Sequence, residues 1–176
     1  NKLFLNKGNF EFEDITIRAG IKKRVGFDVG VSIVDINNDG FLDIYINRAG
    51  WFKGEEKLAN MLYINNGDLT FTEQAEKYGI ADKSRSISST FFDYDKDGDL
   101  DLYIANAPSG YSLSSKIIDL EEIQKSIKTA AFKGSDKLYR NEGNGTFKDV
   151  SVSAGILPDL GFGLNAQVGD LNNDGW

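Results

Sequence analysis

An aspartate-rich loop occurs three times in this chain and constrains the fold more than any other feature. The loops read Asp35-Ile-Asn-Asn-Asp-Gly-Phe-Leu-Asp43, Asp93-Tyr-Asp-Lys-Asp-Gly-Asp-Leu-Asp101 and Asp170-Leu-Asn-Asn-Asp-Gly-Trp176. Each has oxygen-bearing side chains at positions one, three and five and a glycine at position six, where the chain must turn sharply. This spacing curls a short loop around one hard cation, and calcium prefers several oxygen ligands at roughly 2.3–2.6 Å. The sequence therefore predicts metal binding and not a catalytic group.

The expected ligands are the side chains at positions one, three, five and nine and the backbone carbonyl at position seven. In the first two loops they are Asp35, Asn37, Asp39, Phe41 and Asp43, and then Asp93, Asp95, Asp97, Asp99 and Asp101. In the third they are Asp170, Asn172, Asp174 and Trp176, without a position nine. We expect two complete calcium sites and one truncated site, with the affinity falling from loop two to loop one to loop three. The alternative is three surface turns, which Asp, Asn and Gly favour anyway.

The same ligand spacing occurs in the EF-hand, which also needs a Glu at position twelve and a helix on each side. Position twelve is Ile46 in the first loop and Ile104 in the second. The flanking segments 27–33, 42–46 and 100–104 alternate with period two, which is typical of half-buried strands. The loops are therefore predicted to join strands.

Two other markers repeat together with the loop. One is Leu-Phe/Tyr-x-Asn-x-Gly followed by a Phe, beginning at Leu3, Leu62 and Leu138. The other is Ala/Tyr-Gly-Ile, with its glycine at positions 20, 79 and 155. All three markers recur after 58 or 59 residues and again after 76 or 77, so one connection has been lengthened and the frame kept.

Each unit contains four short strand-like segments separated by turn residues, which is the unit of a β-propeller. The predicted fold class is all-β, a partial β-propeller of about three four-stranded antiparallel blade units with one helical insertion. The expected divisions are 1–25 (end of a preceding blade), 26–85 (blade), 86–160 (blade with insertion 107–136) and 161–176 (start of the next blade). Because closed propellers have about 4–8 blades, we expect a segment of a longer protein that packs against the remainder of its own propeller.

The combination of these markers resembles the FG-GAP/VCBS repeats of integrin-α-type β-propellers. It is most similar to the variety found in bacterial secreted proteins, in the ASPIC/UnbV group and in cartilage acidic protein. The resemblance implies the propeller fold over nearly the whole chain apart from the insertion. It implies little about function, because the family includes adhesion receptors, lectin-like binders and propellers attached to enzymes.

Composition narrows the functional classes. The chain has 20 Lys and Arg against 27 Asp and Glu, a formal charge of −7, which argues against nucleic-acid binding. No apolar run approaches the roughly 18–20 residues of a membrane helix, so no membrane insertion is expected. The chain contains neither Cys nor His, which excludes thiolate metal sites, Cys nucleophiles and a Ser-His-Asp triad from its own residues.

The two insertions are the predicted partner surface. Segment 107–136 has apolar residues at helical spacing, which predicts one amphipathic helix that either packs on its blade or forms a platform for a partner. Segment 48–60 carries Trp51 and Phe52, which either contact a partner or pin their own loop. Together with Tyr111 they are the candidate partner-binding residues. Strand connectivity places both insertions at the end opposite the aspartate loops.

We therefore predict an extracellular, cell-surface or periplasmic module in which calcium is structural and the opposite face binds a protein or glycan. Calcium loops of extracellular modules are tuned to concentrations of about 10⁻⁴–10⁻³ M. The alternative is the propeller domain of a secreted polysaccharide-active lyase or hydrolase, although its acids are already assigned to metal. The Asn144-Gly-Thr146 triplet matches a glycosylation acceptor, but a hairpin turn explains the same residues.

Overall fold

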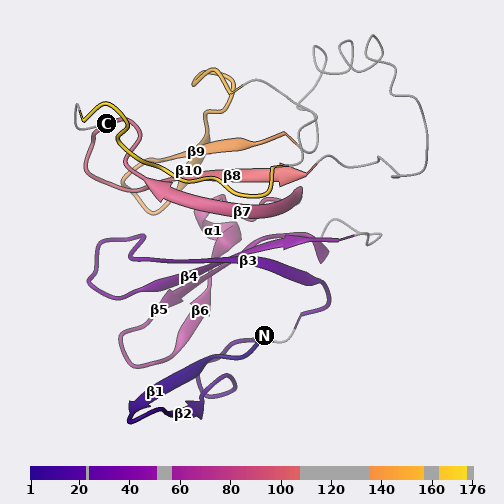
Figure 1. The fold of residues 1–176 in the computed structure, drawn as a ribbon, viewed down its shortest axis with the longest axis vertical. Helices are drawn as coiled ribbons and strands as arrows, with labels where there is room; N and C mark the ends of the chain where they lie inside the picture. The colour runs from indigo at the N-terminus through magenta and orange to yellow at the C-terminus, as the bar shows by residue number, and fades with distance from the viewer. Residues whose placement is uncertain (23, 51–56, 108–134, 157–162, 174–176) are drawn as a thin grey trace.

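The computed structural model describes residues 1–22, 24–50, 57–107, 135–156 and 163–173 (Figure 1). Within these ranges the secondary structure is ten strands and one four-residue helix, α1 (Ala75–Tyr78). The strands form three antiparallel sheets of two, four and four strands. The expected all-β class with blade-like sheets is confirmed, whereas the predicted helix within 107–136 lies outside the described residues.

The two larger sheets are successive meanders, which we call blade 1 and blade 2. Blade 1 comprises β3 (Phe27–Val34), β4 (Asp43–Ala49), β5 (Met61–Asn65) and β6 (Phe71–Glu73). Blade 2 comprises β7 (Arg85–Phe92), β8 (Asp101–Ala107), β9 (Lys137–Asn141) and β10 (Phe147–Asp149). The smaller sheet is the hairpin of β1 (Phe4–Gly8) and β2 (Glu11–Asp14). Each blade has the four strands that the repeat predicted, and strands that are consecutive in the sequence are neighbours in the sheet.

The two blades agree in register as well as in strand number. Ile46 of β4 pairs with Val31 and Met61, and its repeat counterpart Ile104 of β8 pairs with Ser89 and Lys137. A bulge interrupts the first strand pair of each blade at the same place, between Asp28 and Gly30 and between Ser86 and Ser88. The lengthened connection between β8 and β9 therefore leaves the frame of blade 2 unchanged.

The Ala/Tyr-Gly-Ile marker is a single helical turn closed by a left-handed glycine. Gly20, Gly79 and Gly155 have φ values of 77°, 78° and 79°, a conformation that glycine adopts without a steric penalty. A Cβ at Gly79 would also lie only 3.0 Å from the carbonyl oxygen of Phe147. Glycine at this position therefore both ends the turn and lets it pack closely against β10.

The main hydrophobic core lies between the two blades. It gathers apolar side chains from β4, β5, β8 and β9 and from the helical turn. Tyr45 of blade 1 meets the edge of Phe91 of blade 2, with 5.8 Å between ring centres. The expectation of half-buried strands is wrong for β4, in which Tyr45, Asn47 and Arg48 are all at most 1% exposed. Blade 2 covers one face of β4, and side chains around Met61 and Tyr63 occupy the other.

The alternation in β3 places its apolar side chains on an exposed face. Phe27, Val29, Val31 and Ile33 are 49–64% exposed. In blade 2, by contrast, Phe91 at the position that corresponds to Ile33 packs against the core of blade 1. The equivalent face is thus partly buried in β7, where blade 1 lies against it, and exposed in β3 within the described structure.

Candidate metal centres

In the first two aspartate loops, the turn at the tip is built from the first residue of the loop. Asp35 accepts hydrogen bonds from the backbone amides of Asp39 (3.0 Å) and Gly40 (2.8 Å). Asp93 does the same for Lys96 (2.8 Å) and Gly98 (3.1 Å). Gly40 and Gly98 have φ values of 87° and 94°, so the glycine at position six makes the sharp turn that the motif predicted.

The position-nine aspartates, Asp43 and Asp101, are fully buried and join each loop to a neighbouring strand. Asp43 accepts the amides of Ile36 (3.1 Å) and Asn65 (2.8 Å). Asp101 accepts those of Tyr94 (2.7 Å) and Asn141 (2.8 Å). Burial raises the pKa of both carboxyl groups, although these amide hydrogen bonds oppose the shift. The position-nine aspartates thus hold each loop to its neighbouring strand, a role that the ligand spacing did not predict.

Loop two brings three carboxylates together. One oxygen from each of Asp93, Asp95 and Asp101 lies within 4.8 Å of the other two, the only such acidic group in the described part of the chain. Asp97 accepts the amide of Asp99 at 3.1 Å. Such a set suits a hard divalent cation, because oxygen ligands are what calcium prefers and close carboxylates repel one another without it.

Loop one has the same backbone frame but a different arrangement of its acids. Asp39 accepts hydrogen bonds from the side chain of Asn37 (2.8 Å) and from the backbone amide of Phe41 (2.9 Å). Its two oxygens are therefore engaged within the loop, and Asp35, Asp39 and Asp43 do not form a three-carboxylate group like that of loop two.

Loop three is described only in part. Asp170 and Asn172 lie in the irregular segment 163–173, and Asp174 and Trp176 lie outside the described residues. Asn173 has a φ of 57°, close to the 56° of its counterpart Asn38 in loop one. The described part of loop three therefore contains the left-handed residue found at the same position in loop one.

Position seven shows a feature that the motif did not predict. Its backbone carbonyl was the expected ligand, yet its side chain packs over the next turn in both described loops. Phe41 lies against Gly67, where an added Cβ would be 3.0 Å from the ring, and Asp99 lies against Gly143. Burial, with the nearby carboxylates of Asp97 and Asp101, raises the pKa of Asp99 to about 6. A bound cation would favour the charged form instead.

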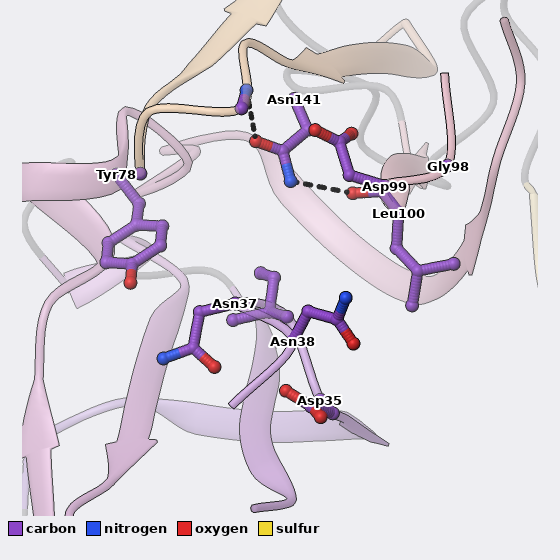
Figure 2. Close-up of a pocket in the computed structure, with 11 residues that line it drawn as sticks. Asp35, Asn37, Asn38, Tyr78, Gly98, Asp99, Leu100 and Asn141 are labelled. Atoms are coloured by element: carbon purple, nitrogen blue, oxygen red, sulfur yellow. Dashed lines mark hydrogen bonds between the residues drawn. The ribbon is translucent and has the colours of Figure 1, made fainter. Parts of the chain in front are cut away.

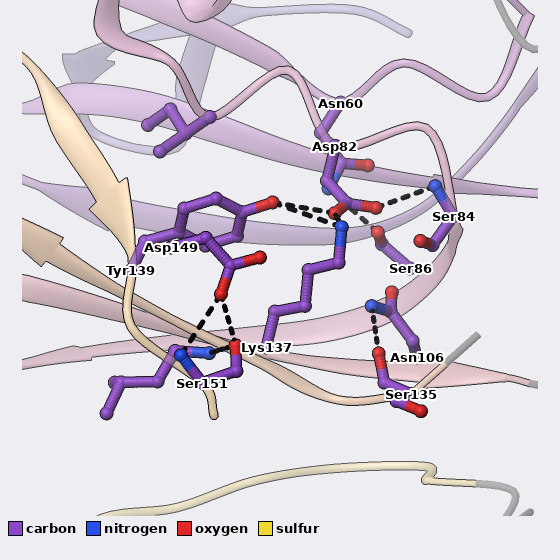
Figure 3. A network of polar contacts seen from close by, with 12 residues as sticks. Asn60, Asp82, Ser84, Ser86, Asn106, Ser135, Lys137, Tyr139, Asp149 and Ser151 are labelled. Carbon is purple, nitrogen blue, oxygen red and sulfur yellow. Dashed lines mark hydrogen bonds and ion pairs between the residues drawn. The ribbon is translucent and has the colours of Figure 1, made fainter. Parts of the chain in front are cut away.

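The end of the blades opposite the loops contains a polar network that sequence reasoning missed (Figure 3). Asp82, whose side chain is fully buried, forms an ion pair with Lys137 and accepts the hydroxyl of Tyr139 at 2.8 Å. Burial alone would raise the pKa of Asp82, but Lys137, together with hydrogen bonds from Ser84 and Tyr139, more than offsets this effect and the pKa is lowered. Fifty-five residues separate Asp82 from Lys137, so no local pattern could have paired them.

The predicted partner-binding residues Trp51, Phe52 and Tyr111 lie outside the described residues.

Comparison with known proteins gives one family and one set of relatives. A family profile described as FG-GAP-like repeat matches residues 54–104 and 129–176, more than half of the chain. Cartilage acidic protein 1 of Xenopus tropicalis is 25% identical over 198 aligned residues, covering 88% of this chain and 31% of the relative. The Mus musculus and Homo sapiens proteins of that name are each 24% identical over the same share of this chain. The chain spans about a third of the length of these relatives.

Within the described residues, no helix has the length and apolarity needed to cross a membrane.

Proposed function

Because the chain belongs to the FG-GAP-like repeat family, we propose that it is part of an extracellular calcium-binding β-propeller that serves as a binding or adhesion module. The convergence of Asp93, Asp95 and Asp101 in loop two carries this proposal. Their three oxygens would hold the ion, with Asp97 and the carbonyl of Asp99 as further ligands. Loop one offers fewer converging carboxylates and would bind calcium more weakly.

The ion would act on the scaffold and not on a substrate. Asp101 is both a proposed ligand and the residue that fixes the start of the β9–β10 turn through the amide of Asn141. A cation at this carboxylate would compensate the repulsion between the acids of loop two and thereby hold the loop against its blade. Calcium binding should then stabilise the folded chain by mass action.

The extracellular assignment is supported by the type of site and by the relatives. Loops of this kind in extracellular modules have dissociation constants of about 10⁻⁴–10⁻³ M, so they fill where calcium is abundant. The relatives carry the word cartilage in their name, which fits a protein of the extracellular matrix. A protein or glycan partner at the end opposite the loops, near Trp51, Phe52 and Tyr111, remains part of the proposal.

Isothermal titration of calcium into the EDTA-treated chain, with thermal unfolding of the same samples, tests this function. We expect at least one site of submillimolar to millimolar affinity, and a higher melting temperature with calcium than with EDTA. Asp95→Asn should weaken the tightest site roughly tenfold by removing a carboxylate ligand. The matched control is Asp68→Asn, because Asp68 is an exposed turn acid at the same end that bonds Thr70. A chain with no binding heat and an unchanged melting temperature would refute calcium binding.

A further inference from the structure

The β9–β10 turn of blade 2 carries an Asn-Gly-Thr triplet that fits two explanations, a hairpin turn and a glycosylation acceptor. Asn144-Gly-Thr146 is the only Asn-x-Ser/Thr triplet in the sequence. Blade 1 has an equivalent turn, between β5 and β6, that contains no such triplet. The features that the two turns share therefore show what the hairpin itself requires.

The two turns have the same backbone conformation. In blade 2 the amide of Glu142 donates to the carbonyl of Thr146 at 2.9 Å, and the equivalent bond in blade 1 is 3.0 Å long. The middle residues, Gly145 and Leu69, are both left-handed, with φ values of 79° and 67°. The same turn thus forms in blade 1 without an Asn-Gly pair at this position.

The turn uses only the side-chain oxygen of Asn144. Its Oδ1 atom accepts hydrogen bonds from the backbone amide (3.0 Å) and the hydroxyl (2.6 Å) of Thr146. In blade 1 the Oδ1 atom of Asp68 accepts the same two groups of Thr70, at 2.9 Å and 2.5 Å. A carboxylate satisfies this turn as well as an amide does. The hairpin therefore does not explain why residue 144 carries a side-chain nitrogen.

The side-chain nitrogen of Asn144 is accessible. Asn144 and Thr146 are both exposed, and none of the described residues accepts a hydrogen bond from the Nδ2 atom of Asn144. An added Cβ at Gly145 would meet nothing within 4 Å, so the space beside the triplet is open. An N-glycosylation acceptor combines an asparagine, a hydroxyl two residues later and a surface position in a loop, and this turn has all three.

The turn lies at the end of the blades that carries the aspartate loops (Figure 2). Gly143 and Gly145 line a cavity of about 280 Å³ between the blades, together with Tyr78 and residues of loops one and two. The exposed side chain of Asn144 does not line this cavity. A glycan attached to it would therefore extend from the surface beside the cavity, at the end opposite the predicted partner surface.

We infer that Asn144 is an acceptor for N-linked glycosylation. The donor is an oligosaccharide joined through a diphosphate to a polyprenyl lipid, and a transferase of the secretory route supplies it. The Nδ2 atom forms a bond to C1 of the first sugar, while the bond between C1 and the diphosphate oxygen breaks. The lipid diphosphate leaves with the electrons of that bond, and one amide proton passes to a base of the transferase. The inference rests on the proposed extracellular location, because only a chain that enters the secretory route meets this transferase.

Secretion of the chain from cultured animal cells, followed by intact mass measurement, tests this site. We expect the secreted chain to be heavier by one N-linked glycan, and peptide N-glycosidase F to remove that mass. In water enriched in heavy oxygen, this enzyme converts a glycosylated Asn144 to a labelled aspartate, which separates it from a deamidation that preceded the digestion. Asn144→Asp should abolish the modification and keep the turn, because Asp68 occupies the same position in blade 1.

Three further variants sharpen the test. Thr146→Ser keeps the hydroxyl and should retain the glycan, whereas Thr146→Val removes the hydroxyl and should lose it. Asp68→Asn creates an Asn-Leu-Thr triplet in the equivalent turn of blade 1, so it should carry a second glycan. This variant shows that the transferase of the same cells reaches a turn of this geometry.

Two results would overturn the inference. One is a secreted parent chain without a glycan, and the other is a glycan that Asn144→Asp retains. A calcium titration of the chain made in the bacterial cytoplasm, where the transferase is absent, keeps the two proposals distinct. A secreted chain that lacks the glycan but binds calcium removes only this inference. A chain that carries the glycan but binds no calcium removes calcium binding and leaves this inference intact.

Discussion

Blade 1 and blade 2 share one backbone frame but differ in the chemistry at both of their ends. At the loop end, Asp43 and Asp101 accept two backbone amides each in equivalent positions. Three carboxylates then converge in loop two, whereas in loop one Asp39 turns to Asn37. The two loops therefore share the hydrogen bonds of position nine, and the proposed difference in calcium affinity comes from position three, which is Asn37 in loop one and Asp95 in loop two.

The opposite ends differ in which strand carries the cation of an ion pair. In blade 1, Arg48 of β4 is 1% exposed and pairs with Asp28 at 2.8 Å, while its counterpart in blade 2 is Asn106. In blade 2 the cation is Lys137 of β9, paired with Asp82, while its counterpart in blade 1 is Met61. The same fold thus accommodates an ion pair with one buried partner in either of two places, with the buried partner being Arg48 in blade 1 and Asp82 in blade 2.

The largest expected effect comes from breaking these ion pairs. Arg48→Met should lower the free energy of unfolding by about 4 kcal/mol and Lys137→Met by about 3 kcal/mol, because each leaves a carboxylate without its cation. Arg48 should cost more, since it also donates to the carbonyl oxygens of Val25 and Ala59. Urea unfolding measures both values. The double variant Lys137→Met with Asp82→Leu should recover part of the loss, and equal losses for the single and double variants would contradict an ion-pair origin.

The shared frame at position nine predicts a similar effect in the two blades. Asp43→Ala and Asp101→Ala should each destabilise the EDTA-treated chain by about 3 kcal/mol, because each leaves two amides without an acceptor. With calcium present, Asp101→Ala should cost more than Asp43→Ala, since loop two would then lose a ligand of its tighter site. Urea unfolding with and without calcium separates the two contributions. If the two variants lost the same free energy of unfolding in calcium, the predicted difference in calcium affinity between the two loops would be wrong.

Exchanging the residue at position three should reduce the difference in calcium affinity. Asn37→Asp adds a carboxylate to loop one, and we expect its calcium affinity to rise roughly tenfold. The same variant should be slightly less stable than the parent chain in EDTA, because it loses the donor to Asp39 and adds charge. Calorimetric titration measures the affinity. A weaker loop one after this substitution would show that position three is not a ligand.

The smallest expected effect is a pH dependence from Asp99. Its pKa is raised from 3.8 to about 6, so the folded chain holds this proton more tightly than the unfolded chain does. In EDTA the stabilisation by the protonated carboxyl is therefore complete below about pH 4 and is lost as the pH rises through 6. The melting temperature in EDTA should therefore fall between pH 5 and pH 7, and calcium should reduce this fall by favouring the carboxylate. Asp99→Asn should lack this component. The Asp82 carboxyl does not contribute in this window, because its pKa is lowered and its stabilisation is lost only as the pH falls below its usual range.

Much of the fold was accessible to sequence reasoning because it repeats. The four-strand unit, the strand-loop-strand topology and the sharp turns at Gly40 and Gly98 follow from local patterns seen more than once. The same reasoning predicted half burial for β4, which is buried on both faces, and treated all carboxylates of a loop alike. Burial and side-chain direction depend on what packs against a strand or loop, which spacing does not specify.

By itself, the sequence determined the repeat frame and the type of ion its loops could bind, because both depend on residue spacing along a short stretch of chain. Tertiary structure decided which carboxylates meet. It also supplied the amides that Asp43 and Asp101 accept from 22 and 40 residues away and the pairing of Asp82 with Lys137. The cavity lined by Tyr78 belongs to the same category. Such contacts join distant segments, so they exist only once one blade packs on the other.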